Sequence, residues 1–214
     1  MSSWIHKSTL IGVTVALGCA LLASMDTGAS PLVSKRVEFE RGPAKQAPSP
    51  NDKASIRLLA PANEDADPKM EAVSGDNKLS LGSLRRSAFV FWRPDSGAAV
   101  LWDMAYSNRY LVRLIRTTPA LSEVKGFDAT IKQRALREFH PGELIHYWPY
   151  VEGWTKQNEL AVVVCADGAP PKSPANTRLV GFQRGYLIDT DKIEIRSEFP
   201  ASEFMERIGT NPCQ

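Results

Sequence analysis

Leu160–Ala166 reads LAVVVCA, an apolar run between Glu159 and Asp167. A short, continuous apolar run that is rich in β-branched residues and bounded by polar ones is typical of a strand buried on both faces of a sheet. We therefore predict a central strand at this position. The other strands and helices of the folded domain are expected to pack around it.

Further strands are predicted on both sides of this run from aromatic and β-branched composition and from bounding turn residues. They cover Ser87–Trp92, Tyr110–Ile115, Glu143–Val151, Arg178–Phe182, Tyr186–Ile188 and Lys192–Arg196. Ala98–Ala105 fits a strand or a helical face, and we favour the strand, which makes a three-stranded meander with its neighbours. Pro149 lacks a backbone N–H, so its strand is expected to lie at a sheet edge or to carry a bulge.

Two helices complete the predicted fold. In Asp128–Phe139 the apolar residues recur at helical spacing, and Asp128 is a suitable N-cap. Pro200–Ile208 begins with a proline, which is favoured in the first helical turn, and Gly209 follows it as a stop. Strands, a helix, more strands and a closing helix indicate an α+β fold with one mostly antiparallel sheet and two helices.

The folded domain is expected to cover residues 78–214, because all five tyrosines and four of the five tryptophans lie beyond residue 78. Residues 30–77 are predicted to be a disordered, proline-rich linker, in which Phe39 is the only aromatic residue. A segment so poor in large apolar side chains is not expected to bury enough surface to offset its chain entropy. Residues 1–29 are predicted to be a signal peptide or a single membrane anchor.

The N-terminal prediction rests on Thr9–Met25, TLIGVTVALGCALLASM, which contains no charged residue and follows Lys7. A positive start, an apolar core and small residues at the cut define a secretory signal, and cleavage after Ala23 or Ala29 fits these rules. The run also approaches the roughly 20 residues that span a bilayer, so an uncleaved anchor is an alternative. Lipidation at Cys19 is a third interpretation. We expect the rest of the chain to lie outside the cytoplasm, in the cell envelope or secreted, although Lys35, Arg36 and Arg41 after the segment leave the orientation of an uncleaved anchor open.

Cys165 and Cys213 are the only cysteines beyond the N-terminal segment. An even pair in an exported protein indicates a disulfide, which would tie the C-terminal end of the chain to the central strand. In the chain-entropy treatment such a bond stabilises the fold by roughly 3–4 kcal/mol. The alternative is a nucleophilic Cys165, which would need a histidine base, whereas the surrounding run is apolar and disfavours a thiolate.

Tyr147, Trp148, Tyr150 and Trp154 form an aromatic stretch of unusual density. Core packing is one interpretation, because strands are rich in aromatic residues. The other is a recognition surface for a polymer, a peptide or a protein, since tryptophan and tyrosine are favoured at interfaces. These four residues are the predicted partner-binding surface.

The formal net charge of +2 is too mild for nucleic-acid binding, which takes a clustered basic face. The sequence contains no local motif for catalysis, for a metal or for a cofactor. We therefore predict a non-enzymatic binding or accessory module of a larger envelope assembly. Its expected partner is a protein or a cell-envelope polymer, and it also contacts the membrane if the N-terminal segment stays attached.

Two alternatives remain open. The first alternative is an exported hydrolase, because many catalytic sites have no local motif. Its site would be assembled from scattered residues such as Asp103, His146 and Glu152. A secreted effector or inhibitor is the second. Removal of the linker would release it, and its mature chain would begin near residue 78.

Export predicts a shortened chain. We expect N-terminal sequencing and intact-mass measurement of the native protein to show a soluble chain that begins at Ser24 or Ser30. An intact chain in the membrane fraction would instead establish the anchored form. An intact chain in the soluble fraction would contradict both.

Overall fold

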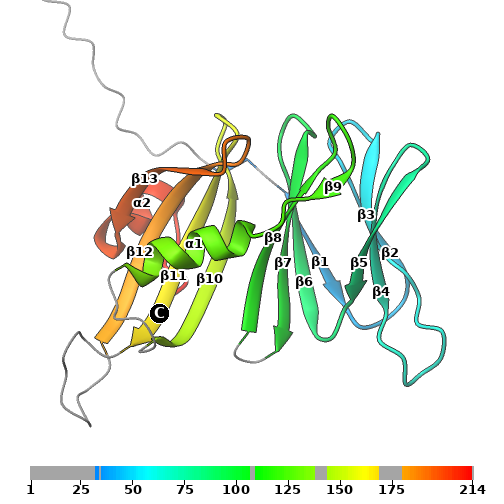
Figure 1. Ribbon diagram of the computed structural model, residues 1–214, viewed down its shortest axis with the longest axis horizontal. Helices are drawn as coiled ribbons and strands as arrows, with labels where there is room; N and C mark the ends of the chain where they lie inside the picture. The colour runs from blue at the N-terminus through cyan, green and yellow to red at the C-terminus, as the bar shows by residue number, and fades with distance from the viewer. Residues whose placement is uncertain (1–31, 34, 107–108, 138–143, 169–179, 214) are drawn as a thin grey trace, which may run out of the picture.

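The computed structural model describes residues 32–33, 35–106, 109–137, 144–168 and 180–213. Over these ranges the chain forms thirteen strands in three antiparallel sheets and only two short helices (Figure 1). The prediction of an α+β fold with one sheet and two helices is therefore wrong, and the protein is mostly β.

The strands fall into an N-terminal sheet, a middle sheet and a C-terminal sheet. The N-terminal sheet has the order β2 (Lys45–Pro48), β3 (Ala54–Leu58), β4 (Lys69–Ser74) and β5 (Asn77–Ser83). The middle sheet has the order β1 (Arg36–Glu40), β6 (Ser87–Trp92), β7 (Ala98–Tyr106), β8 (Arg109–Arg116) and β9 (Ser122–Glu123). The C-terminal sheet has the order β10 (Leu144–Trp154), β11 (Glu159–Gly168), β12 (Val180–Asp189) and β13 (Glu194–Pro200).

The sheets are stacked in three layers, with the middle sheet between the other two (Figure 1). Phe89 and Val100 lie on the face of the middle sheet that shares a core with the C-terminal sheet. Val90 and Leu101 lie on the opposite face and share a core with the N-terminal sheet. Alternate residues of a strand point to opposite faces, so a middle layer needs apolar residues at successive positions. The run SAFVFW of β6 meets this requirement.

Two tryptophan side chains connect the layers through backbone carbonyls. Trp92 of the middle sheet donates its indole N–H to Ala47 O of the N-terminal sheet at 3.0 Å. Trp154 of the C-terminal sheet donates to Phe91 O of the middle sheet, also at 3.0 Å. Each bond satisfies a buried indole donor, which would otherwise cost roughly 1–3 kcal/mol.

The predicted fold also contained a disordered linker before the domain. For the described residues of 30–77 this prediction is wrong, because β1–β4 and the start of β5 lie there. Strands β2–β5 of the N-terminal sheet are short and have exposed or half-exposed residues between buried ones, so only some of their residues need to be apolar. Phe39, Ile56 and Met70 are no more than 1% exposed. The composition change near Lys78 falls inside β5, the last strand of the N-terminal sheet, and precedes β6, in which Ala88–Trp92 are all buried.

The prediction of a central strand is confirmed by β11, which lies between β10 and β12 and leaves Leu160–Val164 at 0% exposure. The expectation from Pro149 is confirmed as well, since β10 is an edge strand with a shift of register near each end. Residues 98–105 are a strand, β7, rather than a helix. The two short strands expected at 178–182 and 186–188 are one strand, β12, over the described residues.

Both predicted helices are present in their described parts. α1 (Phe127–Leu136) lies on the inner face of the C-terminal sheet, where Ile131 and Ala135 join the core shared with the middle sheet (Figure 1). Its N-cap is Gly126 and not Asp128, whose Oδ1 instead accepts a hydrogen bond from Val112 N of β8. The second helix follows a 3₁₀ turn (Ala201–Glu203). It is α2 (Phe204–Ile208), and Gly209 ends it in the left-handed conformation.

Neither helix of the described chain has the length and apolar character to cross a membrane. Thr9–Met25 lies outside the described residues. The signal, anchor and lipidation interpretations of that segment therefore stay predictions.

Gly185 of β12 provides a test of the packing between the last two strands. It lies opposite Phe199 of β13, and an added Cβ would overlap with the phenyl ring. We expect Gly185→Ala to lower the free energy of unfolding by about 1–3 kcal/mol, as overpacking does. Gly181 lies in the same strand with no atom within 4 Å of an added Cβ, so Gly181→Ala is the control. Equal losses in urea titrations of the two variants would contradict this packing.

Candidate functional site

A cavity of about 380 Å³ opens where the edge strand β10 meets the middle sheet. Arg36 of β1, Phe91 of β6 and Trp102 of β7 line it from the middle sheet. Tyr150 and Glu152 of β10 line it from the C-terminal sheet. Its volume falls in the range of about 300–1,000 Å³ that is usual for small-molecule sites. This space is called the Trp102 cavity below.

Trp102 is the centre of an aromatic cluster beside the cavity. Its ring stacks on Phe89 with 5.2 Å between centroids and meets Tyr110 at 6.1 Å and Tyr150 at 5.5 Å. The residue is 7% exposed, and its buried indole N–H has no hydrogen-bond partner in the described part of the chain. Buried donors are nearly always paired, so this indole is one of the few buried polar groups that the described part of the chain leaves unsatisfied.

Glu152 and Arg36 bring opposite charges to the same cavity. Burial raises the pKa of the Glu152 carboxyl, and the positive charge of Arg36 acts in the opposite direction. No hydrogen bond to this carboxyl from a described residue contributes to its pKa. The Arg36 guanidinium lies 4.8 Å from the centroid of the Phe89 ring, a cation–π contact. The cavity therefore presents one acceptor group and one cationic donor group.

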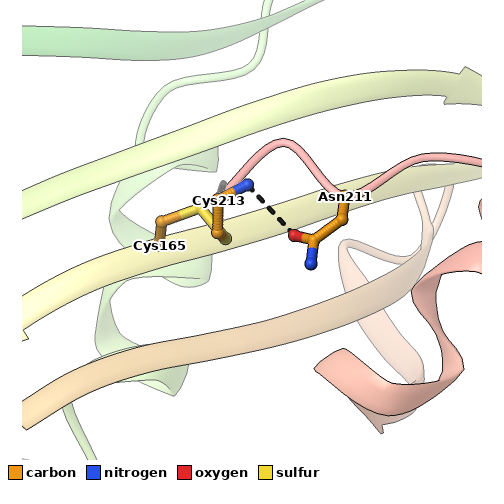
Figure 2. The surroundings of a disulfide bond; sticks show 3 residues. All are labelled: Cys165, Asn211 and Cys213. Carbon is orange, nitrogen blue, oxygen red and sulfur yellow. Dashed lines mark hydrogen bonds between the residues drawn. A yellow bond between two sulfur atoms is a disulfide. The ribbon is translucent and has the colours of Figure 1, made fainter.

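One wall of the cavity belongs to the C-terminal tail, residues 209–213, which follows α2. Thr210 and Pro212 of this tail line the cavity. Cys213 forms a disulfide with Cys165 of β11, with 5.6 Å between the Cα atoms (Figure 2). These are the two cysteines that the sequence-based prediction pairs. The bond holds the tail against the C-terminal sheet.

The four aromatic residues of the predicted partner-binding surface do not share one face. Trp154 is fully buried, and burial raises the pKa of the Tyr147 hydroxyl well above its ordinary value. Trp148 packs on the outer face of the C-terminal sheet and stacks on His146 with 4.9 Å between centroids. Of the four, Tyr150 lines the Trp102 cavity. Side chains of a strand alternate between its faces, which separates neighbours in sequence.

The scattered hydrolase residues are not brought together either. Asp103 points toward the N-terminal sheet with Arg113, whose Nη1 lies 4.0 Å from its carboxylate. Glu152 lies on the opposite side of the middle sheet, in the Trp102 cavity. His146 is on the same strand as Glu152 but roughly 20 Å away along it, at about 3.3 Å per residue. Its Nδ1 lies 3.6 Å from Asp167 Oδ2.

Two other cavities are lined by charged groups that already have partners. The one between α1 and β13, of about 460 Å³, contains Arg134, which pairs with Glu198, and an unpaired Ser197 hydroxyl. The one beside the β12–β13 turn, of about 420 Å³, contains Asp189, which binds Arg196 and two backbone N–H groups. The Trp102 cavity differs because its carboxyl, that of Glu152, receives no hydrogen bond from a described residue. We therefore take it as the candidate site.

Within the described ranges, no three histidine, cysteine, aspartate or glutamate side chains gather as a metal site. Comparison of the chain with protein-family models, with curated proteins and with solved structures finds no match. The site is therefore interpreted from its own chemistry.

Arg36 and Trp102 are the members of the site that sequence reasoning missed. Arg36 fell in the supposed linker, and Trp102 in a segment that fitted either a strand or a helix. No local signal joins them, because the pairing of β1 with β6 and of β6 with β7 creates their proximity. Glu152 was named as a hydrolase residue, and Tyr150 as part of the aromatic stretch.

Removal of the charge at residue 36 tests whether Arg36 and Glu152 share the cavity. In Arg36→Met the pKa of the Glu152 carboxyl is expected to rise further, because a positive charge that lowers it is gone. Carbon-detected NMR titration of the glutamate carboxyls measures this pKa, with Glu152→Gln for assignment. Lys45→Met removes the same charge at an exposed position of the N-terminal sheet and should leave the pKa unchanged. A Glu152 pKa that does not rise in Arg36→Met would contradict the proximity.

Proposed function

We propose that this protein is an exported, non-enzymatic binding module that holds a neutral saccharide unit of a cell-envelope polymer in the Trp102 cavity. The observation that carries the proposal is the combination of groups around this one aromatic cavity. The indole N–H of Trp102 and the carboxyl of Glu152 lack partners among the described residues, and the guanidinium of Arg36 lies beside them. The guanidinium offers donors and the carboxyl an acceptor to a ligand.

The charges of the cavity favour a neutral ligand. A cationic ligand is attracted by Glu152 but repelled by Arg36, and the reverse holds for an anionic ligand, so the pair favours neither charge. A ligand with several hydroxyl groups avoids both costs. Each hydroxyl donates to a carboxylate or accepts from a guanidinium or an indole, and bonds of this kind to charged groups are the stronger ones.

The aromatic side chains suit the remaining surface of a saccharide. A sugar ring carries apolar C–H groups between its hydroxyls, and these pack on aromatic rings. Tyr150 is half-buried and Trp102 is almost fully buried, so Tyr150 offers the more accessible ring. Tyrosine and tryptophan combine a large apolar face with a polar end, which fits a ligand of mixed character.

Export and binding have separate support. The signal-like segment Thr9–Met25 supports export, and so does the Cys165–Cys213 disulfide, since such bonds persist in oxidising compartments. Binding is favoured over hydrolysis because Asp103 and Glu152 lie on opposite sides of the middle sheet. A cell-envelope polymer is a saccharide-bearing partner that an exported module meets.

A glycan array of neutral, acidic and amino oligosaccharides tests the proposal with the full chain in a mild detergent. We expect neutral oligosaccharides to be captured. Glu152→Gln should weaken their binding by about tenfold or more, because a hydrogen bond to a charged group contributes roughly 1.5–3 kcal/mol. Glu206→Gln removes the same charge from an exposed position of α2 and should bind like the wild type.

Three results would overturn the proposal. The first is a folded, disulfide-bonded protein that captures no glycan. The second is capture restricted to acidic or to amino saccharides, which would contradict the preference for a neutral ligand. The third is specific capture of an envelope protein with no glycan binding, which would establish a protein partner instead.

A further inference from the structure

The C-terminal tail that walls the Trp102 cavity depends on one covalent bond for its position. Its hydrogen bonds to described residues are local: Gly209 N donates to carbonyls of α2, and Cys213 N donates to Asn211 Oδ1 at 3.2 Å (Figure 2). None of these bonds reaches the sheet. The link to the sheet is the disulfide from Cys213 to Cys165 of β11, where Cys213 also packs against the outer core cluster.

The two cysteines of the disulfide differ in solvent exposure. Cys165 is 7% exposed within the buried run of β11. Cys213 is half-buried and lies near the end of the chain. An attacking thiolate therefore reaches the sulfur of Cys213 more readily, since thiol–disulfide exchange depends on access.

We infer that the Cys165–Cys213 disulfide is a redox switch of the Trp102 cavity. In the oxidised protein the bond keeps Thr210 and Pro212 in the cavity wall. In the reduced protein the tail leaves the sheet, and the cavity opens to solvent on that side. The opening itself follows from the geometry of the tail. Its effect on saccharide binding rests on the function proposed above.

The reductant in this inference is a protein dithiol. One of its thiolates attacks the Cys213 sulfur, forms a mixed disulfide and displaces Cys165 as a thiolate, which takes up a proton. The second thiol of the reductant then attacks the mixed disulfide and releases Cys213 as a thiol. The reductant leaves as a disulfide, and two electrons and two protons have passed to the cysteines. Oxidation in the reverse direction closes the wall.

This switch makes the site conditional on the compartment. In a reducing cytosol the wall is missing, and the disulfide forms only after the chain reaches an oxidising compartment. Saccharide binding is then expected in the oxidised form, and roughly tenfold weaker binding in the reduced form, because few residues dominate a small site.

Fluorine NMR of the full chain labelled with 5-fluorotryptophan tests the opening without any ligand. All variants carry Cys19→Ser, so that dithiothreitol acts on one disulfide, and Trp102→Phe assigns the resonance of residue 102. We expect reduction to shift the Trp102 resonance and to give it a solvent isotope shift in D₂O. The Trp92 resonance should stay unchanged, because that ring faces the N-terminal sheet. Cys213→Ser should show the shifted Trp102 resonance without reductant.

The outcomes separate this inference from the proposed function. A Trp102 resonance that stays unchanged, while thiol titration shows complete reduction, overturns the switch even if glycans still bind. This comparison is made with both Cys165 and Cys213 present and holds if Cys213→Ser does not fold. A Trp102 resonance that shifts on reduction supports the switch. If no glycan then binds either redox form, the proposed function falls and the switch stands.

Discussion

The burial of β6 on both of its faces is the constraint on which the rest of this fold depends. One strand cannot cover two cores unless successive residues are apolar and a sheet lies on each side. Phe91 and Trp92 show how the requirement is met. The carbonyl of Phe91 accepts the indole of Trp154 from one side, while the indole of Trp92 donates to Ala47 on the other. Two neighbouring residues thus fix the register of three layers.

Sequence patterns predict such a fold unevenly. Runs with large apolar residues at successive positions, such as Leu160–Ala166, are recognisable because no linker has that composition. The N-terminal sheet is not, since its strands are four to seven residues long and carry apolar side chains on alternate positions. In β2, Ala47 is buried, whereas Lys45, Gln46 and Pro48 are exposed. By composition β2 is a polar segment, although the strand contributes one buried side chain to the core.

The candidate site was harder to predict than the fold for a related reason. Tyr150 and Glu152 are close in sequence, and both attracted attention there. Arg36 and Trp102 meet them only through the pairing of β1, β6 and β7 and the crossing of β10 over the middle sheet. A site assembled by register has no spacing to recognise. The aromatic stretch of β10 was misleading in the opposite way, because the register shift between Val151 and Gly153 places Trp148 and Trp154 in different environments.

The carboxyls of Asp95 and Glu152 differ in how the structure compensates their burial. Arg93 is almost fully buried and donates to Asp95 and Asp191 at 2.7 Å each, which ties the β6–β7 turn to the β12–β13 turn. Burial acts to raise the pKa of Asp95, but hydrogen bonds from Arg93 and a backbone amide outweigh it and hold that pKa below its ordinary value. At Glu152 burial prevails, because no described residue hydrogen-bonds to the carboxyl. This difference between the two carboxyls is what motivates the proposal that the Trp102 cavity takes a ligand.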